Sequence, residues 1–254
     1  MKQQPSYGFP LFSILIRFTF LLFIVIFIFL LILSKIPPFI TVLISISLIT
    51  TYLYFGVVLF KKHFLNYRIK LLNKMINAAD LKGDETILDL GTGSGFLSIG
   101  FAKFINNGKV YGIDRYNLKY DTLKTKLFSF IKINFVGNNL KNAKRNVKIE
   151  NLEKKCEFIS ADLTKPFNFP DKYFDIILSS QFLYCLPNKK RLTVYDEINR
   201  VLKKHGKIIF FESKAFRGWD TKELKEYFEK YGYQIDIIQD EEYKGRCIIF
   251  GTKI

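Results

Sequence analysis

Two acidic residues and three closely spaced glycines near the middle of the chain have the types and spacing to hold a nucleotide-like ligand. Asp89 is followed by Gly91, Gly93 and Gly95 in the segment ILDLGTGSG, and a second apolar run ends at Asp114. Glycine lets a backbone adopt positive φ and approach a ligand closely. A carboxylate at the end of a second strand can accept hydrogen bonds from both ribose hydroxyls. The pattern therefore indicates a turn that binds a nucleoside.

Apolar runs on both sides of the glycines predict the elements that position these residues. Residues 86–90 are typical of a buried parallel strand, and the glycines of a turn into a helix that ends near Phe104. Residues 109–113 predict a second strand, and apolar residues at a helical period between 72 and 79 predict an earlier helix. The segment is therefore expected to be a strand–helix–strand unit whose first turn is rich in glycine.

Two classes of cofactor bind to units of this kind. Dinucleotide-binding proteins show GxGxxG, which places the pyrophosphate at the N-terminus of the helix. Here the third glycine comes one residue early, and Phe96 follows it. The turn also follows Asp89, whose carboxylate suits a cationic ligand better than a pyrophosphate. The residues therefore favour a cationic nucleoside, with an NAD(P)-dependent oxidoreductase as the alternative enzyme.

The glycine segment and the residues after it resemble the class I S-adenosylmethionine-dependent methyltransferases, whose first motif is an acid followed by GxGxG. Residues 160–187, SADLTKPFNFPDKYFDIILSSQFLYCLP, are similar to the third and fourth strands of that family. Residues 198–213, INRVLKKHGKIIFFES, are similar to its next helix and fifth strand. The resemblance covers about residues 71–253 and is nearest to the branch labelled methyltransferase type 11 or 25. It implies an α/β fold with a Rossmann-like, doubly wound, seven-stranded sheet whose last strand is antiparallel.

The resemblance implies S-adenosylmethionine as the cofactor and assigns roles to individual residues. Asp162 would meet the adenine amino group, and Leu163 would lie beside the ring. The fourth strand would end at the methyl acceptor. The residues that we expect to bind the cofactor are Asp89, Gly91, Thr92, Gly93, Gly95, Asp114, Arg115, Asp162, Leu163 and Ser179.

The sequence offers no evident general base where the methyl acceptor is expected. In several members of the family a His or Asn follows the fourth strand, whereas here Tyr184 and Cys185 stand near that place. Tyr184 is the candidate for contact with the acceptor, with an ordinary core or helix-cap tyrosine as the alternative. Glu212 ends the fifth strand near the rim, where a surface salt bridge explains it equally. Because methyl transfer depends mainly on orienting two reactants, a missing base does not exclude activity.

Other compositional features limit the possible partners. The three cysteines are far apart and show no zinc-binding spacing, so no metal site is expected. Lys and Arg outnumber Asp and Glu by 39 to 23, which suits an anionic partner but also follows from a lysine-rich composition. The segment FDIILSS lacks the Asn/Asp-Pro-Pro-Tyr/Phe pocket that enzymes use on extruded bases, which argues against nucleic acid as the substrate.

Two long apolar runs near the N-terminus predict a pair of transmembrane helices. Residues 11–33 form a run of 23 with one charge, and residues 39–60 a run of 22 with none. A spanning helix needs about 20 apolar residues, whereas a cleaved signal peptide would have a shorter core. We therefore expect residues 1–62 to form a transmembrane hairpin and residues 63–254 to form the methyltransferase domain.

Flanking positive charge predicts the orientation of this hairpin. KKHFLNYRIK, residues 61–70, follows the second run, whereas the connecting loop offers only Lys35. By the positive-inside rule the N-terminus and the catalytic domain are expected on the cytoplasmic side. The sequence thus predicts a membrane-anchored methyltransferase that acts on a small molecule or a lipid. It leaves open a catalytically silent tether that binds the cofactor, the oligomeric state, and the role of residues 115–139.

Overall fold

The computed structural model describes residues 38–116, 139–213, 215–216, 219–242 and 245–254, and the single positions 22, 25, 26 and 29. Of these, residues 71–116 and those from 139 onward belong to one compact unit, and residues 38–70 belong to another. The larger unit contains all the residues that we expect to bind the cofactor.

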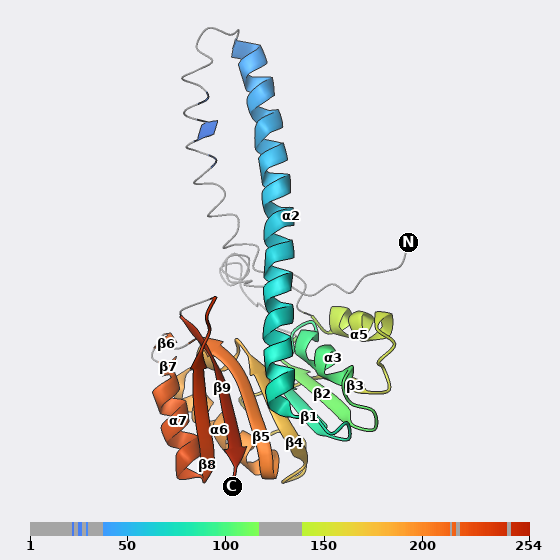
Figure 1. Ribbon diagram of the computed structural model, residues 1–254, viewed down its shortest axis with the longest axis vertical. Helices are drawn as coiled ribbons and strands as arrows, with labels where there is room; N and C mark the ends of the chain where they lie inside the picture. Colours follow the sequence, from blue (N-terminus) through green and yellow to red (C-terminus); the bar gives the residue numbers. More distant parts are fainter. Residues whose placement is uncertain are drawn as a thin grey trace. The chain divides into compact units, whose positions relative to one another are not determined.

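A seven-stranded sheet in the order β3-β2-β1-β4-β5-β9-β8 forms the centre of the larger unit (Figure 1). Its strands are β1 (Thr86–Leu90), β2 (Lys109–Asp114), β3 (Cys156–Ser160), β4 (Phe174–Ser180), β5 (Leu202–Ser213), β8 (Tyr233–Gln239) and β9 (Arg246–Lys253). Strands β1 to β5 are parallel, and β9 runs antiparallel to both of its neighbours. The predicted seven-stranded sheet with an antiparallel last strand is therefore confirmed.

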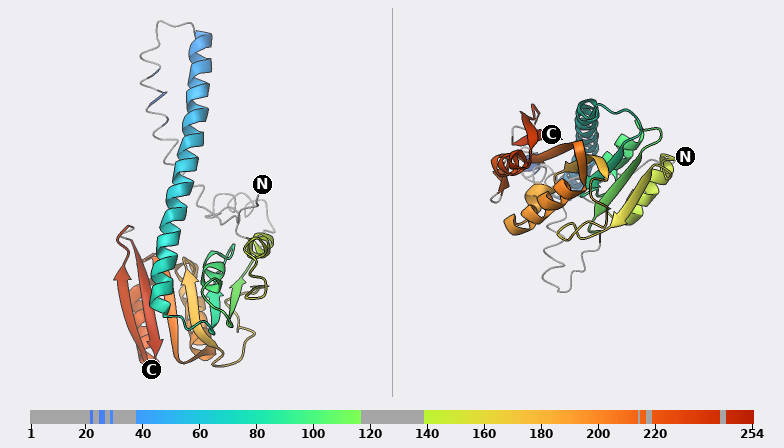
Figure 2. Two further views of the ribbon diagram at one scale, coloured as in Figure 1. Left: turned by 45° about the vertical axis from the view of Figure 1, so that its right-hand side comes forward. Right: turned by 90° about the horizontal axis from the view of Figure 1, so that it is seen from below.

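Helices cover both faces of this sheet, as in a doubly wound fold. The described helices are α2 (Pro38–Ala79), α3 (Phe96–Ala102), α5 (Leu140–Ile149), the single 3₁₀ turn η1 (Leu183–Cys185), α6 (Asn188–Val201) and α7 (Thr221–Lys230). Helices α6 and α7 lie on one face, and α3 and the last turns of α2 lie on the other (Figures 1 and 2). A separate two-stranded ribbon pairs β6 (Ala215–Phe216) with β7 (Trp219–Asp220).

The central strands β1 and β4 are buried on both faces, which explains their nearly continuous apolar runs. On the α6 face, Phe210 of β5 packs in one apolar cluster with Tyr195 of α6, Phe228 of α7 and Trp219. The indole Nε1–H of Trp219 donates to the Tyr195 hydroxyl at 2.9 Å, which satisfies a buried donor. This core fixes the carboxyl ends of β4 and β5 relative to one another.

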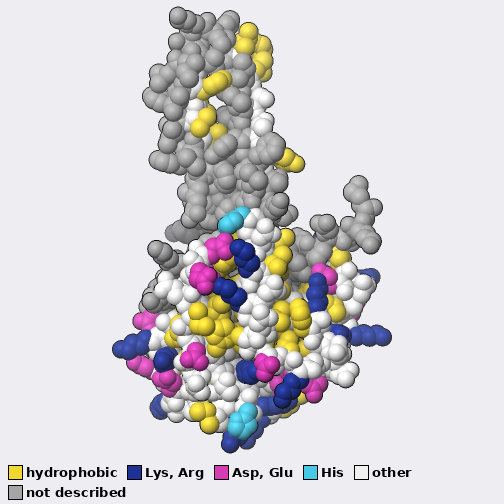
Figure 3. All heavy atoms as spheres, viewed as in Figure 1, with side chains coloured by type: hydrophobic (Ala, Val, Ile, Leu, Met, Phe, Trp, Pro, Cys, Tyr) yellow, Lys and Arg dark blue, Asp and Glu magenta, His cyan; other side chains and the backbone are white. Residues whose placement is uncertain are grey.

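The surface of the larger unit carries charges of both signs. Lys and Arg side chains lie among Asp and Glu side chains over the described part of the face in view (Figure 3). On that face, the excess of 39 basic over 23 acidic residues in the whole chain does not gather into one basic patch of described residues.

The N-terminal part differs from what the sequence predicted. Helix α2 begins at Pro38, since proline is tolerated in a first helical turn, and it continues for 42 residues. The expected second span, residues 39–60, and the expected helix after it are therefore one helix, and the expected boundary at residue 62 falls inside it. The expected first span, residues 11–33, lies outside the described residues except at four positions.

Within the part of the chain that the structure describes, we find no helix with the length and hydropathy that crossing a membrane requires. The predicted transmembrane hairpin is thus not supported.

Gly108, which directly precedes β2, allows a test of the close backbone packing between the starts of β1 and β2. A Cβ at this position would lie 2.2 Å from the backbone oxygen of Glu85, beside the hydrogen bond from Lys109 N to that oxygen. Gly108→Ala should therefore lower the free energy of unfolding by about 1–3 kcal/mol through overpacking. Thermal melting of the full chain measures the loss. Gly245→Ala is the matched control, because no atom lies within 4 Å of its added Cβ. Equal melting temperatures for the two variants would contradict the expected clash.

Candidate functional site

The glycine-rich turn joins β1 to α3 at the carboxyl edge of the parallel strands. Gly91 and Gly95 have φ of 71° and 83°, which side-chain-bearing residues rarely adopt. A Cβ on Gly91 would lie 2.8 Å from Phe182, and one on Gly95 would lie 2.6 Å from Phe158. The turn is fastened to β2, because Gly91 N–H donates to the carbonyl oxygen of Ile113 at 2.9 Å. Glycine is thus required both for the backbone conformation and for close packing.

Asp114, the last residue of β2, reaches this turn directly. The backbone N–H of Gly93 donates to Oδ2 of Asp114 at 2.8 Å. Burial raises the pKa of the Asp114 carboxyl, and the hydrogen bonds from the backbones of Gly93 and Arg115 oppose that rise. The structure therefore brings together the glycine turn and the acid that the sequence analysis paired with it.

Asp89 supports the turn from inside the fold. Its Oδ2 accepts hydrogen bonds from Ser98 of α3, from the hydroxyl at 2.6 Å and from the backbone N–H at 3.1 Å. The hydroxyl of Thr92 lies 2.8 Å from the same Ser98 hydroxyl. Burial raises the pKa of Asp89 to about 6. The side chains of Asp89 and Thr92 thus fix the first turn of α3 through Ser98. The motif alone did not reveal this role of Ser98.

A second support comes from α5, far along the chain. Asn146 is fully buried, and its Nδ2 donates to the backbone oxygen of Ser94 at 3.0 Å. This bond holds the glycine turn from the side of β3. The sequence analysis missed it, because nothing near Asn146 marks a contact with residues 52 positions earlier.

A cavity of about 220 Å³ lies beside the end of β3, next to Asp162. Its walls include Ile113, Ile159 and the loop of residues 165–169. Oδ1 of Asp162 accepts hydrogen bonds from the backbone N–H and the hydroxyl of Thr164, which lower the pKa of Asp162.

Arg115 and Leu163, two further residues expected to bind the cofactor, differ in their surroundings. Nη1 of Arg115 lies 3.9 Å from the second oxygen of Asp162, so both residues lie near the cavity. Leu163 is buried in the apolar core with 3% of its surface exposed.

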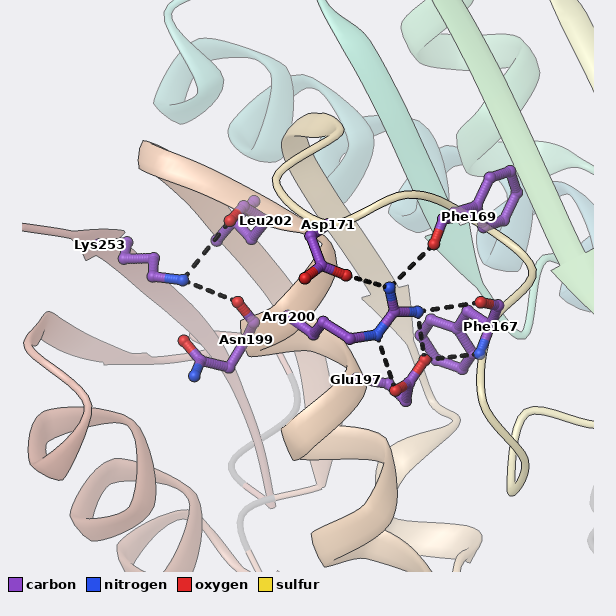
Figure 4. A network of polar contacts seen from close by, with 8 residues as sticks. All are labelled: Phe167, Phe169, Asp171, Glu197, Asn199, Arg200, Leu202 and Lys253. Carbon is purple, nitrogen blue, oxygen red and sulfur yellow. Dashed lines mark hydrogen bonds and ion pairs between the residues drawn. The ribbon is translucent and has the colours of Figure 1, made fainter.

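Arg200 of α6 fastens the loop that walls this cavity (Figure 4). Its guanidinium donates to the backbone oxygens of Phe167 and Phe169, both at 2.9 Å, and to Oδ1 of Asp171 at 2.7 Å. Two further bonds at 2.9 and 2.7 Å join it to the carboxylate of Glu197, which also accepts the backbone N–H of Phe167. A bidentate guanidinium–carboxylate pair has a fixed geometry, so it sets the position of the loop.

The carboxyl ends of β4 and β5 meet around a buried acid. Oε1 of Glu212 accepts hydrogen bonds from the Ser179 hydroxyl at 2.8 Å and from the N–H groups of Phe182 and Leu183, both at 3.1 Å. Its Oε2 is buried and has no hydrogen-bond partner among the described residues. Of the two alternatives for Glu212, the surface salt bridge is wrong, because the side chain is fully buried. Burial raises the pKa of Glu212 to about 7.

Two tyrosines flank the site. Tyr184 lies half-buried in η1, where burial raises the pKa of its hydroxyl. The hydroxyl of Tyr116 is buried without a hydrogen-bond partner in the described part of the chain. Burial, and then the charges of Asp114 and Asp89, raise the pKa of Tyr116. Sequence reasoning missed Tyr116, although its place two residues after the acid of β2 was a usable signal.

No group of three or more His, Cys, Asp and Glu side chains that could hold a metal ion occurs among the described residues. The described residues of the site comprise its carboxylates, its glycine turn and the cavity beside β3.

Comparisons with known proteins agree with this arrangement. Residues 119–210 match a protein family described as a methyltransferase domain. The chain is also similar to the histone-arginine methyltransferase CARMER of Drosophila mojavensis, with 30% identity over 132 residues. That match covers 52% of this chain and 20% of the curated relative, so the chain spans only a part of that relative's length.

Solved structures extend the likeness to the whole sheet. A SAM-dependent methyltransferase from Aquifex aeolicus has a TM-score of 0.54 and 20% identity, covering 72% of this chain and 89% of that one. The magnesium protoporphyrin IX methyltransferase of Synechocystis PCC 6803, solved with bound SAM, has a TM-score of 0.51 and 14% identity, covering 73% and 77%. The chain therefore has the α/β fold of these methyltransferases.

The role of Arg200 in holding the loop at residues 165–171 can be tested with Arg200→Lys. A lysine keeps the charge but cannot form the planar set of bonds to Phe167, Phe169 and Glu197, so residues 165–171 should lose rigidity. Hydrogen exchange followed by mass spectrometry should show faster exchange, by roughly tenfold or more, in this loop. Exchange in β4 should stay unchanged. Uniform acceleration over the whole sheet would instead indicate that Arg200 acts through global stability.

Proposed function

We propose that the chain is an S-adenosylmethionine-dependent methyltransferase. The observation that carries this proposal is the 2.8 Å bond from Gly93 N–H to Asp114, which puts a carboxylate at the mouth of a left-handed glycine turn. Ligands of open α/β sheets bind beyond the carboxyl ends of the strands, where the strand order reverses. In this sheet the reversal lies between β1 and β4, beside that turn.

The residues around the turn fit a cationic nucleoside. Asp89 and Asp114 form no ion pair with any described residue, and burial raises the pKa of both. Two carboxylates beside the turn disfavour a pyrophosphate through like-charge repulsion and favour a cation. The hydroxyl of Tyr116 has no hydrogen-bond partner among the described residues, and a ligand rich in hydroxyls and amines would satisfy this buried group. These features support a sulfonium nucleoside over a dinucleotide.

Each part of the site has a distinct task in this proposal. When bound, S-adenosylmethionine supplies a methyl group on a positively charged sulfur. Asp114 would accept hydrogen bonds from the ribose hydroxyls, and Asp162 would meet the adenine amino group beside the cavity. The half-buried Tyr184 lies on the turn after β4, where it would contact the methyl acceptor. Holding two reactants in line can supply roughly 7–11 kcal/mol of the barrier.

Calorimetry of the full chain, kept in mild detergent, tests the cofactor. Wild type should bind S-adenosylmethionine and should bind NADH far more weakly. Asp114→Ala should weaken S-adenosylmethionine binding by roughly 10- to 100-fold, because hydrogen bonds to a charged group contribute about 1.5–3 kcal/mol. Asp236→Ala, at an exposed position of β8, is the matched control and should bind like wild type. Tighter binding of NADH, or an unaffected Asp114→Ala variant, would contradict the proposal.

We further propose that the N-terminal residues hold the protein at a membrane, with the catalytic unit in the cytoplasm and a small lipophilic molecule as the acceptor. Two apolar runs, residues 11–33 and 39–60, support this location, as does the basic segment at residues 61–70. Tethering raises the encounter rate with acceptors that dwell in the membrane. The mixed charges in Figure 3 and the missing base pocket give no support to nucleic acid as the acceptor.

Membranes from cells that express the full chain test this location and the acceptor together. After an alkaline wash, which removes peripheral proteins, the chain should stay with the membranes. On addition of cofactor carrying a labelled methyl group, the label should enter the organic phase of a lipid extract. Membranes with an inactive Asp114→Ala chain are the control. Release of the chain by the wash would refute the anchor, and label confined to water-soluble products would refute the lipid acceptor.

A further inference from the structure

Glu212 is the buried acid whose two oxygens have the most unequal surroundings. Oε1 accepts one hydroxyl from β4 and backbone N–H groups of the turn that follows, whereas Oε2 is buried with no partner among the described residues. No described basic side chain forms an ion pair with Glu212. Its fractional exposure is 0%.

A glutamine would fit these surroundings better than a glutamate does. Its Oε1 could accept the same hydrogen bonds, and it would avoid burying a charge, which is costly when the charge is not paired. The carboxyl therefore lowers the stability of the fold whenever it is ionised. What a carboxyl can supply here and an amide cannot is a negative charge or a transferable proton.

The position of Glu212 favours the charge as its contribution. The backbone N–H of Phe182 binds Glu212, and the side chain of that phenylalanine packs so closely on Gly91 that an added Cβ would lie 2.8 Å away. Ser179, the other donor, is paired with Leu90 in the register of β4 and β1. Phe182 alone thus separates the buried carboxyl from Gly91 on the first path, and Ser179 and Leu90 separate them on the second.

Other ionisable groups face Glu212 from the elements packed around it. They are Tyr184 and Cys185 on η1, Tyr195 on α6, and Arg246 and Cys247 on β9. Burial raises the pKa of both tyrosines, so they stay neutral near pH 7. A guanidinium stays charged over the working range. Asp89 of β1 titrates in the same range, because burial raises its pKa to about 6.

We propose that the ionised carboxylate of Glu212 makes the site prefer the cationic sulfonium cofactor over its neutral thioether product. This inference rests on the proposed function. The two ligands share the adenosine, the amine and the carboxylate, and differ by the transferred methyl group and one positive charge. A negative charge enclosed in a medium of low polarity attracts the sulfonium and has little effect on the thioether. The preference therefore promotes release of the product and its replacement by fresh cofactor.

Calorimetry of the full chain with S-adenosylmethionine and S-adenosylhomocysteine as probes measures this preference. Because burial raises the pKa of Glu212 from 4.5 to about 7, the charge is present above that pH and absent well below it. The ratio of the Kd of S-adenosylhomocysteine to that of S-adenosylmethionine should rise roughly three- to tenfold between about pH 5.5 and pH 8.5. In Glu212→Gln the part of this rise that Glu212 causes should be lost, so the rise should be smaller than in wild type. Any effect of Asp89 persists in both proteins and cancels in the comparison.

Stability gives a second readout that does not depend on ligands. An acid whose pKa is raised in the folded state stabilises the fold at low pH, and this contribution is lost as pH rises through about 7. The melting temperature of wild type should therefore fall relative to Glu212→Gln between about pH 5 and pH 8. Glu153→Gln, at an exposed position before β3, is the matched control and should behave like wild type in both measurements.

The outcomes separate the two proposals. A wild-type ratio that does not change with pH, or a Glu212→Gln ratio that changes as in wild type, overturns the role of Glu212 and leaves the proposed function intact. If wild type binds neither probe, the proposed function fails and this inference fails with it. A flat wild-type ratio overturns the role of Glu212 even if the Glu212→Gln chain does not fold.

Discussion

The hydrogen bond from Gly93 N–H to the Asp114 carboxylate joins two elements on which the rest of the site depends. It ties the turn after β1 to the end of β2, and the bond from Gly91 N–H to Ile113 reinforces that connection. A turn in which three alternating glycines, Gly91, Gly93 and Gly95, have positive φ has little conformational preference of its own, because glycine loses more freedom on folding than other residues. Its shape must therefore come from neighbours, and Asp89, Ser98 and Asn146 provide the remaining contacts.

The strands and their order along the chain could largely be predicted from the sequence, because they depend on local patterns. β1 coincides with the predicted residues 86–90, since a short apolar run between turn residues carries a clear signal. The antiparallel direction of β9 was implied by the family resemblance and not by the apolar pattern. The continuity of α2 could not be predicted in the same way. The change from apolar to basic residues near position 61 suggested a boundary, yet lysine, leucine and arginine are good helix formers and the helix passes through them.

The contacts that hold the site were harder to predict, because they join residues distant in the chain. Asn146 binds Ser94 across 52 positions, and Ser179 binds Glu212 across 33. A motif records which residues follow one another, and neither of these pairs belongs to one motif. Glu212 was misjudged for a related reason: in sequence it ends a strand beside Lys and Arg residues, as a surface glutamate would, and the turn after β4 buries it.

Burial of acids at one edge of the sheet gives these observations a common physical cause. Asp89, Asp114 and Glu212 end or nearly end three parallel strands, and none forms an ion pair with a described residue. Desolvation raises the pKa of all three, so each charge is held at an energetic cost that hydrogen bonds only partly offset. The free-energy cost of these buried charges falls when a cation enters the same enclosed region. The arrangement therefore favours the binding of positively charged ligands. A pyrophosphate would increase the cost, so the same residues that weaken the fold also select the ligand.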